Sequence, residues 1–374
     1  MKYWNYIKHL KDILLKNRAT PKYLVLFVTD RCNARCEHCL LGETSSDPKE
    51  ELTLAEIEKT AKNMDDLMFL LPTGGEPFLR GDLAEIIKIF YKETNVRNVG
   101  IPTNGSLTEQ AVKTIEEILS SCPEIDLAVD VSIDGVGRTH DRIRNVPGLF
   151  DKAVNTYKEL KKLKKRYHNL NVNGEITVSS FNENELKETY DYLTGTLGVD
   201  TVITLLTRGR PRNPSAKDFD INKYEEYSIL LEEGVKNGAL SGHSNFPFHD
   251  LVNAHRIVKN RLIARTVREN KYQVPCFAGR FGAAISAKGD VLPCELLPDK
   301  AIGNVRDFDY DFRKIWSSKK ADEVRAWIRK TKCFCTYECF LTLNILFNPG
   351  LYPAILKEWL SIKWSRLSRS GKGK

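Results

Sequence analysis

The strongest constraint on the fold is a unit of about 30 residues in which a short apolar, β-branched run is followed by a helical stretch. The apolar runs lie at 23–29, 68–73, 98–103, 126–133, 171–179 and 200–206. The helical stretches lie at about 53–64, 82–94, 108–120, 148–166, 182–197 and 222–236. Such alternation predicts a parallel α/β sheet or barrel, with its chemistry at the C-terminal ends of the strands.

Two of the expected strands have a polar face. Because successive side chains of a strand point to opposite sides, the apolar faces should meet the helices and the polar faces should line the barrel interior. An interior this polar predicts a ligand cavity. The polar faces consist of Ala128, Asp130, Ser132 and Asp134 in the fourth strand and of Asn171, Asn173, Glu175, Thr177 and Ser179 in the fifth.

Within this cavity, Asp130 and Glu175 are the candidate catalytic residues. A carboxylate there can hold or deprotonate a polar substrate. The alternative is that each simply pairs with a neighbouring Arg or Lys.

The chain has nine cysteines, and eight of them fall in two groups near opposite ends of the sequence. An odd number in two groups indicates metal or cluster ligation better than disulfides. The N-terminus scatters lysines through its apolar residues and lacks a small-residue cleavage site, so no secretory signal is expected. We therefore predict a cytoplasmic protein, with reduced thiols.

Three cysteines, Cys32, Cys36 and Cys39, directly follow the first expected strand. Thiolates bind soft metals and iron–sulfur clusters, and three on one loop can hold three corners of a cubane while the fourth iron stays open for chemistry. The alternative is a structural zinc site. Zinc normally takes four protein ligands, and His38 is poorly placed between its neighbours to be the fourth.

The spacing Cys32-x3-Cys36-x2-Cys39 after a first strand resembles the signature of the radical S-adenosylmethionine (SAM) enzymes. In that family the cysteines hold a 4Fe-4S cluster and SAM chelates the fourth iron. Cleavage of SAM gives a 5′-deoxyadenosyl radical that abstracts hydrogen from the substrate. The resemblance covers about residues 20–240 and implies a partial (βα)6 barrel.

Three further motifs support this resemblance, each at a strand end. They are "TGGEP" at 73–77, "TNG" at 103–105 and "SIDG" at 132–135, followed by "HDRIRN" at 140–145. The resemblance implies that Glu76 receives the ammonium of SAM, while Ser132 and Arg144 contact its ribose and carboxylate. The residues implied to bind SAM are Gly74, Gly75, Glu76, Thr103, Asn104, Ser132, Asp134 and Arg144.

The second cysteine group begins with Cys276 and Cys294 around an apparent hairpin and continues in "CFCTYECF" with Cys333, Cys335 and Cys339. This group resembles the SPASM/twitch extension, which binds auxiliary 4Fe-4S clusters. Five cysteines are enough for one four-cysteine cluster and one spare. Whether Cys333 or Cys335 is a ligand stays open, and a zinc ribbon is the alternative.

We expect four segments: a basic amphipathic helix at 1–20, the barrel at 21–240, a linker and SPASM/twitch domain at 241–345, and a second basic helix with a disordered tail at 346–374. Residues 1–22 and 353–374 each carry six Lys or Arg and one acid, so the ends contribute +10 to a net charge of +8. Because the basic charge lies in the ends, no nucleic acid is expected as a partner. The end helices either lie on the inner face of an anionic membrane or pack on the barrel.

Two functions of different classes follow. The first is a radical SAM enzyme with an auxiliary 4Fe-4S cluster for electron transfer. Its substrate is a peptide, a sugar-like metabolite or a membrane-linked lipid or glycan, and its reductant is flavodoxin or ferredoxin. The second is a non-catalytic iron–sulfur or zinc protein that carries electrons or binds a partner. An electron carrier needs no SAM pocket, so Glu76, Ser132 and Arg144 distinguish the two.

Overall fold

The computed structural model describes residues 20–41, 47–242 and 248–370. Within these ranges, one sheet of nine strands has the order β6-β5-β4-β3-β2-β1-β7-β8-β9. The strands are β1 Tyr23–Thr29, β2 Phe69–Gly74, β3 Asn98–Thr103, β4 Asp126–Ser132, β5 Leu170–Val178, β6 Val202–Leu206, β7 Gly282–Ile285, β8 Asp290–Leu292 and β9 Gly303–Asn304. β1 to β6 are parallel, as predicted.

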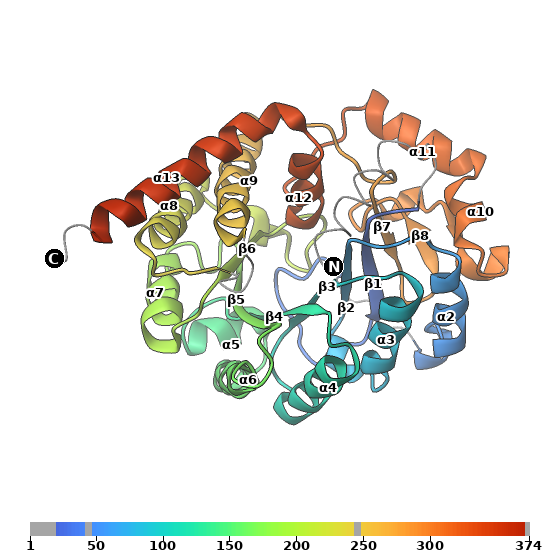
Figure 1. Cartoon of the computed structure of the whole chain (residues 1–374), viewed down its shortest axis with the longest axis horizontal. Helices are drawn as coiled ribbons and strands as arrows, with labels where there is room; N and C mark the ends of the chain where they lie inside the picture. Colours follow the sequence, from blue (N-terminus) through green and yellow to red (C-terminus); the bar gives the residue numbers. More distant parts are fainter. Residues whose placement is uncertain (1–19, 42–46, 243–247, 371–374) are drawn as a thin grey trace.

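Helices cover the outside of the sheet (Figure 1). Those of the barrel are α2 Leu54–Lys62, α3 Leu83–Glu93, α4 Thr108–Ser121, α5 Arg138–Arg144, α6 Leu149–Leu163, α7 Leu186–Asp191, α8 Ile221–Asn237 and α9 His249–Glu269. The remaining helices are α10 Phe312–Trp316, α11 Lys319–Lys330, α12 Glu338–Leu346 and α13 Tyr352–Ser370. The apolar face of β4, with Leu127, Val129 and Val131, is fully buried in the core.

The six strand–helix units confirm the predicted partial (βα)6 barrel, and the hairpin expected between Cys276 and Cys294 is formed by β7 and β8. β7 pairs in parallel with β1, so this hairpin extends the barrel sheet itself. Helix α12 lies between α9 and β7 (Figure 1). The cysteine-rich C-terminal segment is therefore placed directly beside the barrel interior.

Two regions differ from the ranges expected from the sequence. The stretch 182–197 becomes helical only at Leu186, because the Asn182 side chain donates hydrogen bonds to the carbonyls of Asp134 and Thr177. The range 241–345 contains α9, a long helix that packs against α8 and α13 and belongs to the barrel side.

Of the two amphipathic terminal helices predicted from the sequence, only the C-terminal one lies within the described residues. The helix expected at 1–20 lies almost wholly outside the described residues, as do residues 371–374 of the expected tail. The C-terminal helix is formed as α13, which packs on α8 and α9 through one face and exposes the other. Packing on the barrel is therefore observed for the inner face of this helix, and membrane contact of the other face stays a prediction.

No single helix in the described part of the chain is long and apolar enough to cross a membrane. The segments Glu338–Leu346 and Pro349–Ser368 meet that criterion only as a pair, by length and composition, and they are bent by 88° relative to each other.

Candidate functional site

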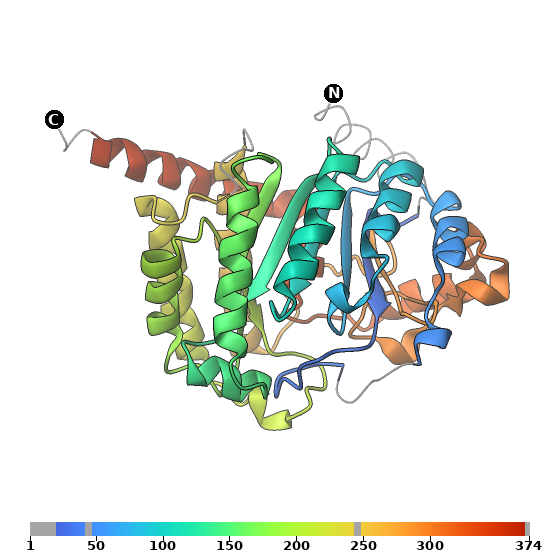
Figure 2. The same ribbon diagram turned by 90° about the horizontal axis from the view of Figure 1, so that it is seen from below.

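A cavity of about 1530 Å³ runs through the barrel interior from one end of the strands to the other. One end is lined by the cysteine loop after β1. The other end is lined by residues at the beginnings of β2, β3 and β4 and by Phe248, Leu251, Tyr352 and Leu356. Figure 2 shows these ends on opposite sides of the molecule, with the loop after β1 below and α13 above. The volume exceeds that of most single-ligand pockets, so SAM and a second molecule fit together.

Most residues predicted from the sequence motifs meet in this cavity. Those lining it are Cys32, Cys36, Cys39, Gly74, Gly75, Glu76, Thr103, Asn104, Ser132 and Arg144. The polar faces of β4 and β5 also point inward, so Asp130 and Glu175 line the same space.

The cysteine loop is fixed by backbone hydrogen bonds on two sides. Arg35 N and Glu37 N donate to the last turn of α5, at 3.2 and 2.9 Å. On the other side, Arg212 N donates to the Cys39 carbonyl at 3.0 Å. All three thiols of the loop are free and line one cavity, so the donor set fits a cluster bound through three irons.

The two glycines of the "TGGEP" motif allow two chain segments to cross. A Cβ on Gly74 would lie 1.9 Å from the Thr29 carbonyl oxygen, and a Cβ on Gly75 would lie 2.0 Å from that of Arg31. Gly75 N donates to the Thr29 carbonyl at 2.9 Å. The glycines therefore set the position of the segment that leads into Cys32.

Glu76 is held by three hydrogen bonds in the wall of the cavity. Its carboxylate accepts from Asn104 N at 2.7 Å, Thr103 Oγ1 at 2.9 Å and Phe78 N at 3.2 Å. Burial raises its pKa, although these donors oppose the shift. A buried carboxylate at this point suits an ammonium group, and the binding of SAM by Glu76 stays a prediction.

Arg144 and Asp134 form a buried ion pair, with Nε 2.7 Å from Oδ2. Burial alone would raise the pKa of Asp134, but Arg144 and two neighbouring histidines lower it to about 2. Asp134 is fully buried and is not among the residues that line the cavity, unlike Arg144. The predicted contact of Asp134 with SAM stays a prediction, and in the structure its carboxylate holds Arg144, which does line the cavity.

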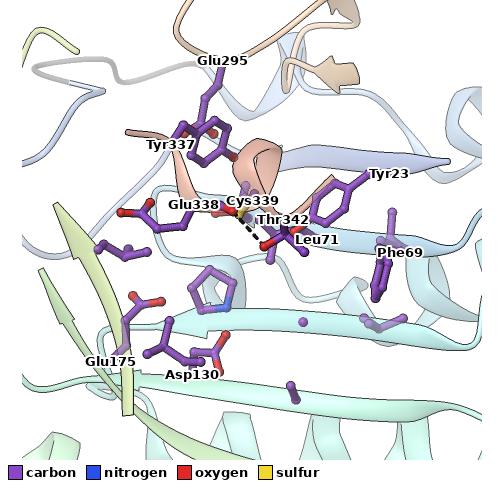
Figure 3. A pocket seen from close by; sticks show the side chains of 18 of the residues that line it. Tyr23, Phe69, Leu71, Asp130, Glu175, Glu295, Tyr337, Glu338, Cys339 and Thr342 are labelled. Carbon is purple, nitrogen blue, oxygen red and sulfur yellow. Dashed lines mark hydrogen bonds between the residues drawn. The ribbon is translucent and has the colours of Figure 1, made fainter. Parts of the chain in front are cut away.

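Asp130 and Glu175 project from β4 and β5 toward Glu338 and Cys339 of α12 (Figure 3). Burial, followed by the charge of Asp130, raises the pKa of Glu175 to about 8, so one proton is retained here at neutral pH. Among the described residues neither carboxylate forms a salt bridge, and Asp130 accepts a hydrogen bond from Asn173 at 2.7 Å. Both carboxylates face the cavity, which is where a substrate would contact them.

Sequence reasoning missed a cationic row on α9, which consists of Arg256 and Lys259, with His255 beside them. All three side chains line the cavity. Burial lowers the pKa of His255 to about 4 and that of Arg256 to about 10. It also lowers the pKa of Lys259 below its usual value. Lys259 Nζ donates one hydrogen bond, 3.4 Å to Thr342 Oγ1, and forms no salt bridge with the described residues. The available signal was their spacing, which continues that of Phe248, Leu251 and Val252 along one helix face.

The C-terminal cysteines separate into two kinds. The thiols of Cys276 and Cys333 are in direct contact, and the charges of Cys333 and Cys335 act on Cys294. Cys339 instead faces the cavity, where it contacts Tyr23. The structure therefore groups Cys276, Cys294, Cys333 and Cys335 as one four-thiol set. This set contains both Cys333 and Cys335, between which the sequence did not decide, and it leaves out Cys339.

This four-thiol set fits an auxiliary cubane, because each thiolate then binds a separate iron.

Arg208 connects this region to the barrel. It follows β6 and pairs with Glu338 at 3.1 Å and with Glu295 at 3.2 Å, while its guanidinium lies over the Tyr337 ring at 4.4 Å. The Glu338 carboxylate also accepts from Leu206 N at 2.8 Å. All these groups are buried or nearly so, and no sequence motif marks them.

Comparison with protein families gives two matches. The model of the radical SAM superfamily matches residues 26–193, and the model of SPASM, an iron–sulfur cluster-binding domain, matches residues 276–340. Together the two matches contain the cysteine loop, the first two SAM motifs at 73–77 and 103–105, Arg144 and all five C-terminal cysteines.

Curated relatives match most of the chain. The AdoMet-dependent heme synthase of Methanosarcina barkeri is 27% identical over 80% of this chain and 82% of its own. The pre-heme d1 synthase of Dinoroseobacter shibae is 25% identical over 84% and 77%. The subtilosin biosynthesis protein AlbA of Bacillus subtilis is 26% identical over 88% and 72%.

Among solved structures, Streptococcus suis SuiB bound to its precursor peptide SuiA superposes with a TM-score of 0.58 at 16% identity, covering 86% of this chain and 71% of that one. At this identity the likeness supports the fold alone.

Proposed function

Because this chain belongs to the radical SAM superfamily and carries a C-terminal iron–sulfur SPASM domain, we propose that it acts on a bulky, carboxylate-bearing substrate held in the long cavity. The chain is an enzyme that uses SAM, a 4Fe-4S cluster and auxiliary iron–sulfur ligation. The substrate class is the part we propose. A small electron carrier such as flavodoxin or ferredoxin supplies the electron in this proposal.

The cofactors have defined places on the chain. Cys32, Cys36 and Cys39 would hold one cluster, and the four-thiol set would hold the auxiliary one. When bound, the first cluster and SAM supply the 5′-deoxyadenosyl radical, and the auxiliary cluster supplies a route for an electron. Glu76 would bind the ammonium of SAM and Arg144 its carboxylate, and both would fix the orientation of SAM.

The observation that carries the substrate class is the cationic row of α9. Arg256 and Lys259 are half-buried one helical turn apart, and desolvation disfavours both charges. Asp130 lines the same cavity, and its charge favours the charged forms of Arg256 and Lys259. A substrate carboxylate between these cations would stabilise them and gain charge-assisted hydrogen bonds.

The rest of the cavity wall favours a large apolar body for this substrate. Aromatic and aliphatic side chains such as Tyr23, Phe27, Phe69, Leu71 and Leu205 line it. A sugar-like metabolite matches this wall poorly. A porphyrin with propionate groups combines the two properties, and two of the relatives are named for heme and pre-heme d1 synthesis. A peptide is the second candidate, since AlbA is named for bacteriocin biosynthesis.

The test uses the anaerobically reconstituted enzyme and iron coproporphyrin III as the probe. We expect binding in an absorbance titration, and 5′-deoxyadenosine formation that rises when the porphyrin is added. Arg256→Met and Lys259→Met should each weaken porphyrin binding about tenfold. Arg265→Met is the matched control, because Arg265 lies on the same helix, pairs with Glu269 and is 64% exposed.

Porphyrin binding that is equal in all three variants would contradict the proposed carboxylate site. Stimulation of 5′-deoxyadenosine formation by a peptide, with no response to the porphyrin, would favour the second candidate.

A further inference from the structure

Helix α13 has two apolar faces. Ile355 and Ile362 are buried on the inner face, against α8 and α9. The outer face carries Tyr352, Leu356, Leu360, Trp364 and Leu367, which are 41, 52, 59, 76 and 67% exposed. We call these five residues the outer stripe. A contiguous apolar surface of this kind on a helix marks an interaction site more often than a solvated face.

The outer stripe is continuous with the far end of the cavity. Tyr352 and Leu356 line the cavity and are also exposed on the surface. Phe248 and Leu251 at the beginning of α9 also line the cavity and are 54 and 38% exposed. The cavity therefore reaches exposed apolar side chains at the end opposite the cysteine loop.

Cationic side chains accompany the outer stripe. At 100° per residue, Lys357 falls on one edge of the stripe, next to Trp364, and Lys363 falls between Tyr352 and Leu356. Lys357 is exposed and forms no salt bridge with the described residues, and Lys363 is 49% exposed although it pairs with Asp250. The last 22 residues carry six Lys or Arg against one acid, and the acid, Glu358, is buried.

We propose that the outer stripe docks on the cytoplasmic face of an anionic lipid membrane, with the far mouth of the cavity turned toward the lipid. Large apolar side chains with a tryptophan, accompanied by lysines, match the interfacial layer of a bilayer in both polarity and charge. The exposed Lys357 at the edge of the stripe and the half-exposed Lys363 favour an anionic surface as the partner. This surface proposal goes beyond the proposed function and does not depend on the substrate being a porphyrin.

The test is co-sedimentation of the full-length, reconstituted enzyme with vesicles of phosphatidylcholine and phosphatidylglycerol. The combined variant Leu360→Ser, Trp364→Ser and Leu367→Ser should lower the vesicle partition coefficient at least about tenfold. None of these three residues lines the cavity, so SAM cleavage without substrate should be unchanged. The control is Ile229→Ser, an apolar residue of α8 that is 56% exposed. Vesicles of pure phosphatidylcholine, or high salt, should weaken binding of the unmodified enzyme.

A fluorescence measurement tests the orientation. Brominated lipid should quench the enzyme's tryptophan emission, and Trp364→Phe should remove most of that quenching, whereas Trp327→Phe on α11 should keep it. Vesicle binding that is equal in the triple variant and the control overturns the proposal. A shift from dimer to monomer in the triple variant, without vesicle binding, assigns the stripe to a second copy. If vesicle binding appears only after residues 1–19 are deleted, that segment is the occupant of the outer stripe, and the proposal is overturned.

Discussion

Cys335 and Cys339 are four positions apart on the chain and face different spaces. The charge of Cys335 raises the pKa of the thiols of Cys276 and Cys294. Cys339 instead lines the cavity and contacts Tyr23. A cluster needs thiolates that can reach one cubane together, and only the first residue meets this requirement. Single-residue substitutions can therefore separate ligation from a role at the cavity wall.

The first prediction concerns iron content. The reconstituted enzyme should bind about eight irons, four for each cluster. Cys335→Ser should lose about half of them, while Cys339→Ser should keep them all, because its thiol lies outside the four-thiol set. Iron and sulfide analysis with EPR spectroscopy measures the difference. Equal iron loss in the two variants would show that Cys339 is a ligand.

The separation of these cysteines could not be predicted from the sequence. Spacing shows that "CFCTYECF" is rich in thiols, but the direction of each side chain depends on where the extended segment ends and α12 begins, at Glu338. The three cysteines after β1 were predictable, because they occupy one short loop at a strand end. The position of Asp134 could not be predicted for a similar reason. Its motif does not show that Asp134 pairs with Arg144 and that only Arg144 lines the cavity.

At the scale of elements, the crossing of two loops positions the first cluster site. The turn after β2 passes so close to the end of β1 that Gly74 and Gly75 leave no space for a Cβ. Glu76 N also donates to the Arg31 carbonyl at 2.8 Å, which joins the SAM motif to the cysteine loop. Displacing either loop therefore moves both sites.

The second prediction tests this crossing. Gly75→Ala should displace Arg31 and the cysteine loop, because the new Cβ would meet the Arg31 carbonyl at 2.0 Å. We expect loss of about four irons and of SAM cleavage, with the auxiliary cluster retained. Gly81→Ala is the control, since a Cβ there meets nothing within 4 Å. Normal SAM cleavage in Gly75→Ala would mean that the crossing does not position the site.

Element positions were predictable where hydrophobic periodicity is strong. The six strands and most of the barrel helices follow their expected ranges closely, because each buries one apolar face in the same core. Helix α9 lacked that signal. Its buried surface includes Asp250 and Asn253, and its cavity face carries the cationic row, so polar residues interrupt the apolar pattern.

At the scale of the whole molecule, the auxiliary region and the barrel form one continuous structure. The sheet passes from β1 into β7, and α12 closes the space between β7 and α9 (Figure 1). Arg208 fixes this arrangement, because it joins the end of β6 to Glu295 beside Cys294 and to Glu338 beside Cys339. The distance between the four-thiol set and the cavity therefore depends on a buried ion-pair network that sequence motifs do not reveal.

The last prediction concerns Arg208→Met. Removing the guanidinium leaves Glu295 and Glu338 buried without their cation, and breaking a buried pair in this way costs about 3–5 kcal/mol. We expect faster amide hydrogen exchange in 331–346 and a lower unfolding temperature, with the cysteine loop at 30–39 still protected. Arg210→Met is the matched control, since Arg210 pairs with Asp299 at 3.8 Å where both side chains are at least 77% exposed, and such pairs contribute little. Equal exchange in the two variants would mean that sheet pairing alone holds the auxiliary region on the barrel.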